Sequence, residues 1–268
     1  MMTDSDVLRV ERLTKRYGNH AALDAVSFAV RQREVVALLG DNGAGKTTLV
    51  KCIAGVTRPD EGGVYLAGQR LHTGSPTGSR DHGIGVVYQD LALFDNMSVA
   101  ENLFAGSEPR WPRWLGGAGV VKRRTMLEEA AQTLERLEVK IPNLRTSAGL
   151  LSGGQRQAIA VAKGIMFARK IVILDEPTAA LGLRERANVL RLVRQLPRNG
   201  IAVILISHNL EEVISVADRC VILRQGKKVG EVPATQENHQ EIVSLIVGGQ
   251  SASLDGQASP ETERGSNA

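Results

Sequence analysis

The sequence predicts an α/β fold built around a mostly parallel sheet. Several short runs are β-branched and almost continuously apolar, which is typical of strands buried on both faces of a sheet. These runs are residues 35–39, 84–87, 171–174 and 201–206. Segments with helix-type apolar spacing lie between them, at residues 46–54, 155–168 and 184–196. Because strands and helices alternate along the chain, we expect a parallel sheet covered by helices.

Two regions depart from this alternation. Residues 1–30 and 62–71 alternate apolar with polar side chains, as half-buried antiparallel strands do. We therefore expect an N-terminal antiparallel β subdomain. From residue 98 to 137 the strand signal disappears and helical patterns dominate, so we expect a helical subdomain inserted at about residues 95–155.

The composition of the 268 residues excludes several classes of protein. With 43% hydrophobic residues and a net charge of +4, the chain is expected to fold as a single domain over residues 1–248. Residues 249–268 are polar and aperiodic, which predicts a disordered tail. No apolar run approaches the ~20 residues of a membrane-spanning helix, and residues 1–6 do not resemble a secretory signal. Cys52 and Cys220 are too far apart for a disulfide scaffold or a Cys-based zinc site.

The excess positive charge is confined to one stretch of the predicted helical subdomain. Residues 107–126 have the Pro and Gly content of a loop and a net charge of +4, equal to that of the whole chain. Both tryptophans, Trp111 and Trp114, lie there as well. A solvated loop and a contact with anionic lipid headgroups or with a membrane protein both remain open. Nothing in this charge distribution predicts a nucleic-acid partner.

Residues 40–47 read Gly-Asp-Asn-Gly-Ala-Gly-Lys-Thr and match the phosphate-binding motif GxxxxGKS/T without a departure. The glycines let the backbone curl, so that N–H groups point at phosphate oxygens at the positive end of the next helix. Lys46 supplies positive charge to the β- and γ-phosphates, and the Thr47 hydroxyl can bind Mg²⁺. The motif predicts a P-loop NTPase core. Its nucleotide-binding residues are Gly40, Asn42, Gly43, Ala44, Gly45, Lys46, Thr47 and Thr48.

Two carboxylates follow another predicted strand. The run 171–174 leads directly into Asp175 and Glu176, which places both at the carboxyl end of a buried strand, where ligands bind in open α/β sheets. Asp175 suits Mg²⁺ coordination, and Glu176 suits polarising the attacking water. A helix cap is the alternative for such a pair taken alone. The phosphate motif favours the catalytic interpretation.

A third motif opens a predicted helix. Leu151-Ser152-Gly153-Gly154-Gln155 places a hydroxyl and free backbone N–H groups at a helix N-terminus, which could bind an anion or form an ordinary serine cap. The order of phosphate motif, LSGGQ, Asp-Glu and then a histidine after the next strand resembles the ATP-binding cassette (ABC) ATPases. The resemblance covers residues 5–248, and LSGGQ at this spacing is highly specific to the family.

The resemblance implies roles for further residues. Tyr17 occupies the position of the aromatic side chain that stacks on adenine, and His208 that of the histidine at the γ-phosphate. Gln89 matches the glutamine that contacts Mg²⁺ and the attacking water, so the implied magnesium ligands are Thr47, Gln89 and Asp175. In the family, two cassettes pair head to tail. Ser152, Gly153, Gly154 and Gln155 of one cassette close over the ATP bound by the other.

The sequence departs from the family pattern after Glu176. Residues 179–182 read Ala-Ala-Leu-Gly where the family has Ser-Ala-Leu-Asp, so Gly182 replaces a carboxylate that contacts the partner cassette. This run and Ser207-His208-Asn209-Leu210 resemble the monosaccharide-uptake cassettes of the ribose and fructose type.

The resemblance implies an ATPase that drives a bacterial ABC importer of a simple sugar. ATP and Mg²⁺ would be the cofactors, and Glu176, His208, Lys46 and Gln89 the catalytic residues. The partners would be a second cassette in a homodimer, a membrane permease and, indirectly, a periplasmic solute-binding protein. The protein would lie at the cytoplasmic face of the inner membrane. Import of another small solute and a non-transport ABC ATPase of the iron–sulfur assembly type are the alternatives.

Overall fold

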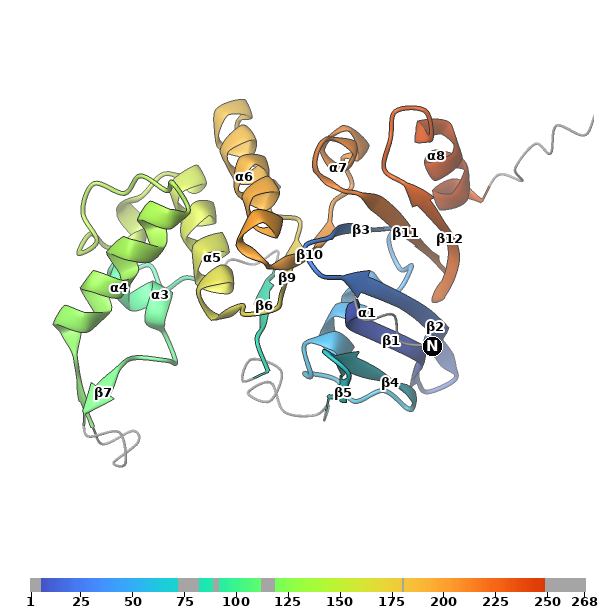
Figure 1. Cartoon of the computed structure of the whole chain (residues 1–268), viewed down its shortest axis with the longest axis horizontal. Coiled ribbons are helices and arrows are strands. Elements are labelled where there is room, and N and C mark those ends of the chain that lie inside the picture. Colours follow the sequence, from blue (N-terminus) through green and yellow to red (C-terminus); the bar gives the residue numbers. More distant parts are fainter. Residues whose placement is uncertain (1–5, 72–81, 89–91, 112–118, 180, 249–268) are drawn as a thin grey trace, which may run out of the picture.

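A six-stranded sheet forms the centre of the protein in the computed structural model, which describes residues 6–71, 82–88, 92–111, 119–179 and 181–248 (Figure 1). Its strand order is β12-β11-β3-β10-β9-β6. The parallel strands are β3 (Val35–Leu39), β6 (Ile84–Val87), β9 (Ile171–Asp175), β10 (Ala202–Ile206) and β11 (Arg219–Arg224). All residues of β3 and β10 are buried, which explains their continuous apolar sequence. The predicted α/β fold is confirmed.

Two strands of this sheet were not predicted. β11 extends the parallel part beyond β3, and β12 (Lys227–Pro233) pairs with it antiparallel. β12 forms an edge of the sheet and is mostly exposed or half-buried. An edge strand of this kind carries lysines and a glycine instead of an apolar run, which removes the signal on which the prediction relied.

The N-terminal antiparallel subdomain is confirmed as a second sheet with the order β2-β1-β4-β5. Its strands are β1 (Asp6–Tyr17), β2 (His20–Arg31), β4 (Glu61–Leu66) and β5 (Gln69–Arg70). Helix α1 (Lys46–Ile53) lies between the two sheets (Figure 1). Its Leu49 and Ile53 are fully buried in the same hydrophobic cluster as Leu8 of β1 and Ile204 of β10. This packing fixes the direction of the helix that follows the phosphate motif.

The chain between β6 and β9 is largely helical, as predicted. It contains α3 (Val99–Phe104), α4 (Arg123–Arg136), a 3-10 turn (Ala148–Leu150) and α5 (Gly153–Phe167). Helices α3 and α4 lie at the side of the molecule away from the antiparallel sheet (Figure 1). A second hydrophobic cluster joins these helices to β9, β10 and α6 (Leu183–Gln195). Helix α5, which begins within the LSGGQ motif, therefore packs both against the other helices of this region and against the central sheet.

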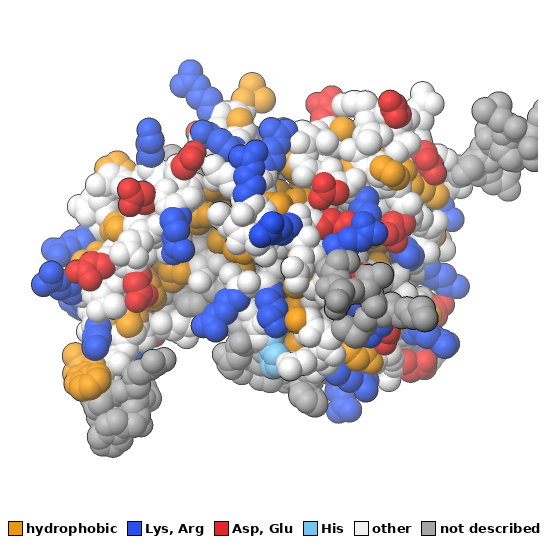
Figure 2. All heavy atoms as spheres, viewed as in Figure 1, with side chains coloured by type: hydrophobic (Ala, Val, Ile, Leu, Met, Phe, Trp, Pro, Cys, Tyr) orange, Lys and Arg blue, Asp and Glu red, His pale blue; other side chains and the backbone are white. Residues whose placement is uncertain are grey.

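The structure corrects the prediction of a loop at residues 107–126. β7 (Arg110–Trp111) and β8 (Val120–Val121) pair antiparallel, and α4 already begins at Arg123. Strands of two residues have no periodic signal, so only the turn residues were visible in the sequence. Residues 112–118, including Trp114, lie outside the described residues. Trp111 is 63% exposed with Lys122 over its ring, and hydrophobic side chains gather at this corner of the surface in Figure 2. Contact with lipid or a membrane protein stays a prediction.

Two C-terminal helices complete the fold. α7 (Leu210–Val216) and α8 (His239–Val247) share a third hydrophobic cluster with β3, β11 and β12. A 3-10 turn (Pro197–Asn199) follows α6 and ends at Gly200, which has the left-handed conformation that glycine adopts without strain. Within the described residues, no helix has both the length and the apolar character to cross a membrane. The predicted tail, residues 249–268, lies outside that part of the chain.

A buried ion pair joins the two sheets at the amino ends of the parallel strands. Arg219 Nε and Nη2 donate to the two carboxylate oxygens of Glu34 at 2.8 and 3.0 Å, and Nη2 also donates to the carbonyl of Ala29 in β2 at 2.6 Å. Burial raises the pKa of the Glu34 carboxyl, but the hydrogen bonds from Arg219 and from the Arg31 backbone outweigh it and lower the pKa overall. The ionised carboxylate is therefore stabilised by folding.

We expect Glu34→Gln to lower the free energy of unfolding by about 2–3 kcal/mol at pH 7, because Arg219 loses a buried counter-charge. The folded pKa of Glu34 is lowered, so the wild-type pair stabilises the fold above the unfolded pKa of about 4.3 and loses this effect as the pH falls through the folded pKa. Urea unfolding between pH 3 and 7 should show a flatter pH dependence in the variant. Glu129→Gln, at an exposed glutamate of α4, is the control. An unchanged pH dependence in Glu34→Gln would contradict the assignment.

Candidate active site

Three of the predicted groups lie together at the carboxyl edge of the parallel sheet. Strands β3, β10 and β9 are neighbours, so the loops that follow them emerge side by side. Lys46 begins α1 directly after the loop that follows β3, the loop after β10 contains His208, and Glu176 follows β9. A cavity of about 470 Å³ is lined by all three of these residues and by Gly40 and Asn42. Strand adjacency thus brings together residues that are far apart in the sequence.

The phosphate loop has the conformation that its glycines permit. Gly40 and Gly45 have φ angles of +147° and +103°. A Cβ atom on Gly40 would lie 2.2 Å from the Leu223 carbonyl oxygen, and one on Gly45 would lie 2.5 Å from the Ala22 carbonyl oxygen. Only glycine fits both positions. The loop is held so closely between β2 and the end of β11 that its backbone N–H groups can line a site for phosphate.

The Lys46 side chain folds back onto the phosphate loop that precedes it. Its Nζ donates hydrogen bonds to the Gly40 carbonyl at 2.6 Å and to the Asp41 carbonyl at 3.0 Å. The ammonium group therefore lies at the mouth of the loop, where two carbonyl oxygens bind it and its charge also acts on the Asp175 carboxyl. Thr47 is exposed, whereas Thr48 is partly buried in the first turn of α1 and Ala44 is buried.

Glu176 and His208 are in direct contact. The Nδ1 atom of His208 lies 2.7 Å from Oε2 of Glu176. The Glu176 side chain is 15% exposed and that of His208 is 79% exposed, so the carboxylate lies inside and the imidazole covers it from the solvent side. Glu176 has a φ of +51°, in the left-handed region that is unfavourable for a residue with a side chain. Strain of this kind is often found at functional sites.

Asp175 lies in a less polar environment beside these residues. Burial raises the pKa of its carboxyl, the negative charge of Glu176 raises it further, and Lys46 opposes the shift. Tyr88, at the end of β6, has a raised pKa because of burial and, secondly, because of Asp175. The ends of β6 and β9 are therefore close together. Gln89, which follows Tyr88, lies outside the described residues.

Tyr17 lies at the end of β1, where it pairs with His20 across the β1–β2 turn. Its ring is 51% exposed, with Lys15 Nζ 5.5 Å from the ring centre. The start of β2 contacts the phosphate loop at Gly45, which brings this turn to the same side of the protein as the loop. An exposed ring in this position is accessible for stacking.

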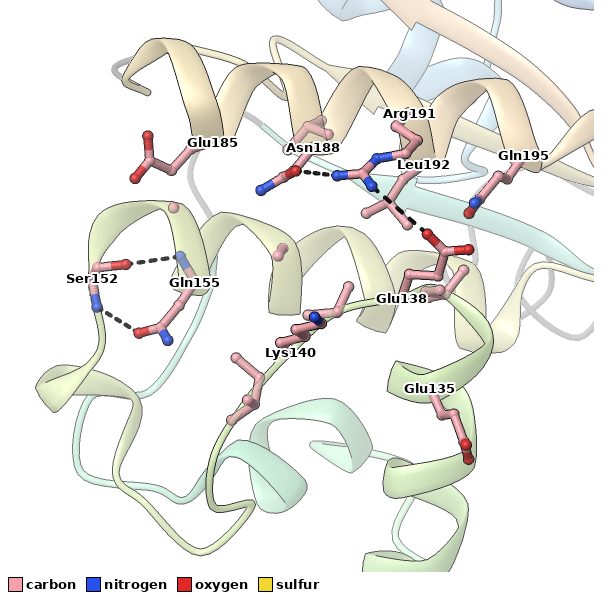
Figure 3. A pocket seen from close by; sticks show the side chains of 16 residues that line it. Glu135, Glu138, Lys140, Ser152, Gln155, Glu185, Asn188, Arg191, Leu192 and Gln195 are labelled. Atoms are coloured by element: carbon pink, nitrogen blue, oxygen red, sulfur yellow. Dashed lines mark hydrogen bonds and ion pairs between the residues drawn. The ribbon is translucent and has the colours of Figure 1, made fainter.

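The LSGGQ residues Ser152, Gly154 and Gln155 do not line the cavity that contains Lys46, Glu176 and His208. Ser152 is the N-cap of α5: its Oγ accepts from the Gln155 N–H at 3.3 Å, and Gln155 Oε1 accepts from the Ser152 N–H at 3.1 Å. Ser152, Gly154 and Gln155 line a different cavity of about 870 Å³, between α4, α5 and α6 (Figure 3). Lys46, Glu176 and His208 are not among the residues that line it.

Glu185 of α6 packs against Gly154 of the LSGGQ motif. It reaches from the first turn of α6 over the start of α5 (Figure 3), and a Cβ atom on Gly154 would lie 2.0 Å from its Cγ. Gly182 is the N-cap of α6 and forms no side-chain cap, and a Cβ atom there would lie 2.7 Å from Oε2 of Glu185. The glycine that replaces the family carboxylate is therefore adjacent to Glu185.

The fold and the site define a P-loop ATPase of the cassette type. Residues 23–179 match the family model described as "ABC transporter", and the chain belongs to this family. Its catalytic activity is ATP hydrolysis. The solved structure of a nucleotide-free ATP-binding cassette from an ABC transporter is similar with a TM-score of 0.78 and 28% identity, over 90% of this chain and 97% of that one.

The curated relatives are of two lengths. The chain is 39% identical to a xylose/arabinose import ATP-binding protein of Sulfolobus acidocaldarius, over 90% of this chain and 94% of that protein. It is 40% identical to a fructose import ATP-binding protein of Rhizobium meliloti, over 92% and 96%. It spans about half of a putative ribose/galactose/methyl galactoside import ATP-binding protein of Geobacillus kaustophilus, with 36% identity over 92% of this chain and 48% of that protein.

Glu212, Thr178 and Glu185 have no functional signal in the sequence. Thr178 nevertheless lies two residues after Glu176, Glu212 lies four residues after His208, and Glu185 packs against Gly154. Asn209 followed three residues later by Glu212 is typical of a helix start, and Asn209 Oδ1 does accept from the Glu212 N–H at 3.2 Å. The Glu212 side chain, however, turns inward and binds Thr178. The sequence contained the cap but gave no sign of this inward contact.

We expect Gly154→Ala to lower the free energy of unfolding of the nucleotide-free protein by about 1–3 kcal/mol, because the new methyl group collides with Glu185. Gly153→Ala is the matched control, since no neighbour lies within 4 Å of its added Cβ, and we expect a change within about 0.5 kcal/mol. Adding Glu185→Ala to Gly154→Ala should recover most of the loss. Equal stability of the two glycine variants in thermal unfolding would contradict the packing.

Proposed function

We propose that the chain is the ATP-hydrolysing subunit of a bacterial importer for a simple sugar. The observation that carries the hydrolytic part is the shared cavity of Lys46, Glu176 and His208, with Glu176 and His208 in contact at 2.7 Å. The sugar part is supported by the relatives, which are named as import ATP-binding proteins for xylose/arabinose, fructose and ribose.

The proposed mechanism is in-line attack of water on the γ-phosphate. Glu176 polarises the water, because its carboxylate is largely shielded from solvent yet lines the cavity. His208 holds that carboxylate and lies exposed where it can reach the γ-phosphate. Lys46 and the backbone N–H groups of the phosphate loop stabilise the negative charge that develops on the phosphoryl oxygens. Tyr17 stacks on the adenine ring.

The residues fit a magnesium ion. Thr47 supplies a hydroxyl oxygen and Asp175 a carboxylate, and Mg²⁺ prefers oxygen ligands. Burial and the charge of Glu176 raise the pKa of Asp175, and a nearby cation would stabilise its ionised form, which supports this assignment. Gln89 is the third proposed ligand. The bound ion would supply charge neutralisation for the phosphate oxygens.

A second copy of the chain would complete each ATP site. Ser152, Gly153, Gly154 and Gln155 lie at an exposed or half-buried helix N-terminus that can face ATP bound to another cassette. A dimeric cassette bound to ADP and phosphate has the same fold, with a TM-score of 0.71 and 23% identity. The further partners would be a membrane permease and a periplasmic solute-binding protein, with the cassette on the cytoplasmic face of the inner membrane. Co-purification of the permease would exclude the iron–sulfur assembly role.

We expect Glu176→Gln to bind ATP with little loss of affinity and to accumulate as a dimer, while turnover falls at least ~100-fold. The amide keeps the size of the side chain but cannot polarise water. Phosphate release and size-exclusion chromatography with ATP measure the two effects. Glu211→Gln, at an exposed residue of α7, should behave as the wild type. Near-normal phosphate release by Glu176→Gln would overturn the mechanism.

A further inference from the structure

A carboxylate is buried at the start of the helix that follows His208. Glu212, in the first turn of α7, is 6% exposed. One of its carboxylate oxygens, Oε2, accepts a hydrogen bond from the Thr178 hydroxyl at 2.6 Å, and the other, Oε1, lies 3.1 Å from Nε of Arg186. Thr178 is itself only 4% exposed. The buried carboxylate thus has a hydrogen-bond partner in Thr178 and an ion-pair partner in Arg186, whose side chain is 34% exposed, and the three form a polar junction.

The three residues of this junction follow the proposed catalytic residues in the sequence. Thr178 is two residues after Glu176, and Glu212 is four residues after His208. Arg186 belongs to the first turn of α6, directly after the segment that contains Gly182. The junction therefore connects the chain after Glu176 to the helix that follows His208.

The local backbone explains why such a connection is needed. Glu176 is held in the left-handed region at φ +51°, and its N–H donates to the Ile206 carbonyl at 2.9 Å. A strained residue keeps its conformation only when the surrounding contacts fix it. On the His208 side, the Ser207 hydroxyl accepts from the Asn209 N–H at 3.1 Å, and Asn209 caps the turn that contains Glu212. The loop after β9 therefore contacts Glu212 through Thr178, and the loop after β10 contacts it through Asn209.

We propose that Glu212, through Thr178 and Arg186, is a positioning residue that holds Glu176 and His208 at the distance needed for hydrolysis. The proposal rests on the catalytic roles assigned to these two residues above. Glu212 does not line the nucleotide cavity. Its removal should therefore change the alignment of the reacting groups and leave nucleotide binding intact.

The experiment compares Glu212→Ala, Thr178→Val and Thr178→Ser with the wild type in phosphate release, ATP binding and thermal unfolding. In Glu212→Ala and Thr178→Val we expect kcat per folded molecule to fall about 10- to 100-fold, because small misplacements of catalytic groups have effects of this size. KM and ATP affinity should change less than about threefold, since the lost alignment affects only the transition state. Thr178→Ser keeps the hydroxyl and should retain near-normal kcat. Thr178→Val removes a single hydrogen bond and gives a test even where Glu212→Ala does not fold.

Glu34→Gln is the matched structural control. It breaks a comparable buried ion pair at the opposite, amino end of the parallel strands, and should lower the melting temperature without lowering kcat per folded molecule. The double variant Thr178→Val/Glu212→Ala should lose no more kcat than Glu212→Ala alone, because both changes break the same contact.

The outcomes separate this proposal from the proposed function. Melting temperatures that fall as in Glu34→Gln with unchanged kcat would overturn the positioning role, and so would a rise in KM without a fall in kcat. If Glu176→Gln abolishes turnover while Glu212→Ala and Thr178→Val retain it, only the positioning role fails. Normal turnover by Glu176→Gln would overturn both.

Discussion

The burial of α1 between the two sheets is the constraint on which the site depends. Leu49, Val50 and Ile53 are enclosed by the antiparallel sheet on one side and the parallel sheet on the other. A helix held in this way cannot rotate, so its N-terminus and the phosphate loop before it point in one direction. Gly40 and Gly45 are then pressed against Leu223 and Ala22 so closely that no side chain fits. The phosphate loop is thus as much a product of core packing as of its own sequence.

The parts of the fold and site that could be predicted are those with local signals. β3 and β10 are continuous apolar runs because both of their faces are buried, and the phosphate motif is contiguous. The contact between Glu176 and His208 joins residues 32 positions apart and exists only because β9 and β10 are neighbours. Motif order could suggest that contact through the family resemblance, but residue patterns alone could not.

Some elements and buried residues could not be predicted, because the spacing of apolar residues in the sequence does not reveal them. The β7–β8 hairpin has strands too short to show an alternation, and β12 is an exposed edge. Glu212 reads in the sequence as part of a polar helix start, because burial of a carboxylate is decided by partners on other elements. Polar residues in the core are therefore the ones for which a structure adds most to sequence analysis.

The two edges of the parallel sheet have different arrangements of charge. At the amino edge, Glu34 and Arg219 have opposite charges, and the lowered pKa of Glu34 shows that folding favours its ionised form. At the carboxyl edge, Asp175 and Glu176 have like charges, and the raised pKa of Asp175 shows that folding opposes its ionisation. The Asp175 carboxylate therefore lowers the stability of the folded state above its unfolded pKa, and a cation bound beside it would oppose this effect. The two carboxylates thus contribute with opposite sign: Glu34 stabilises the fold in its ionised form, whereas the ionised form of Asp175 is destabilised by folding.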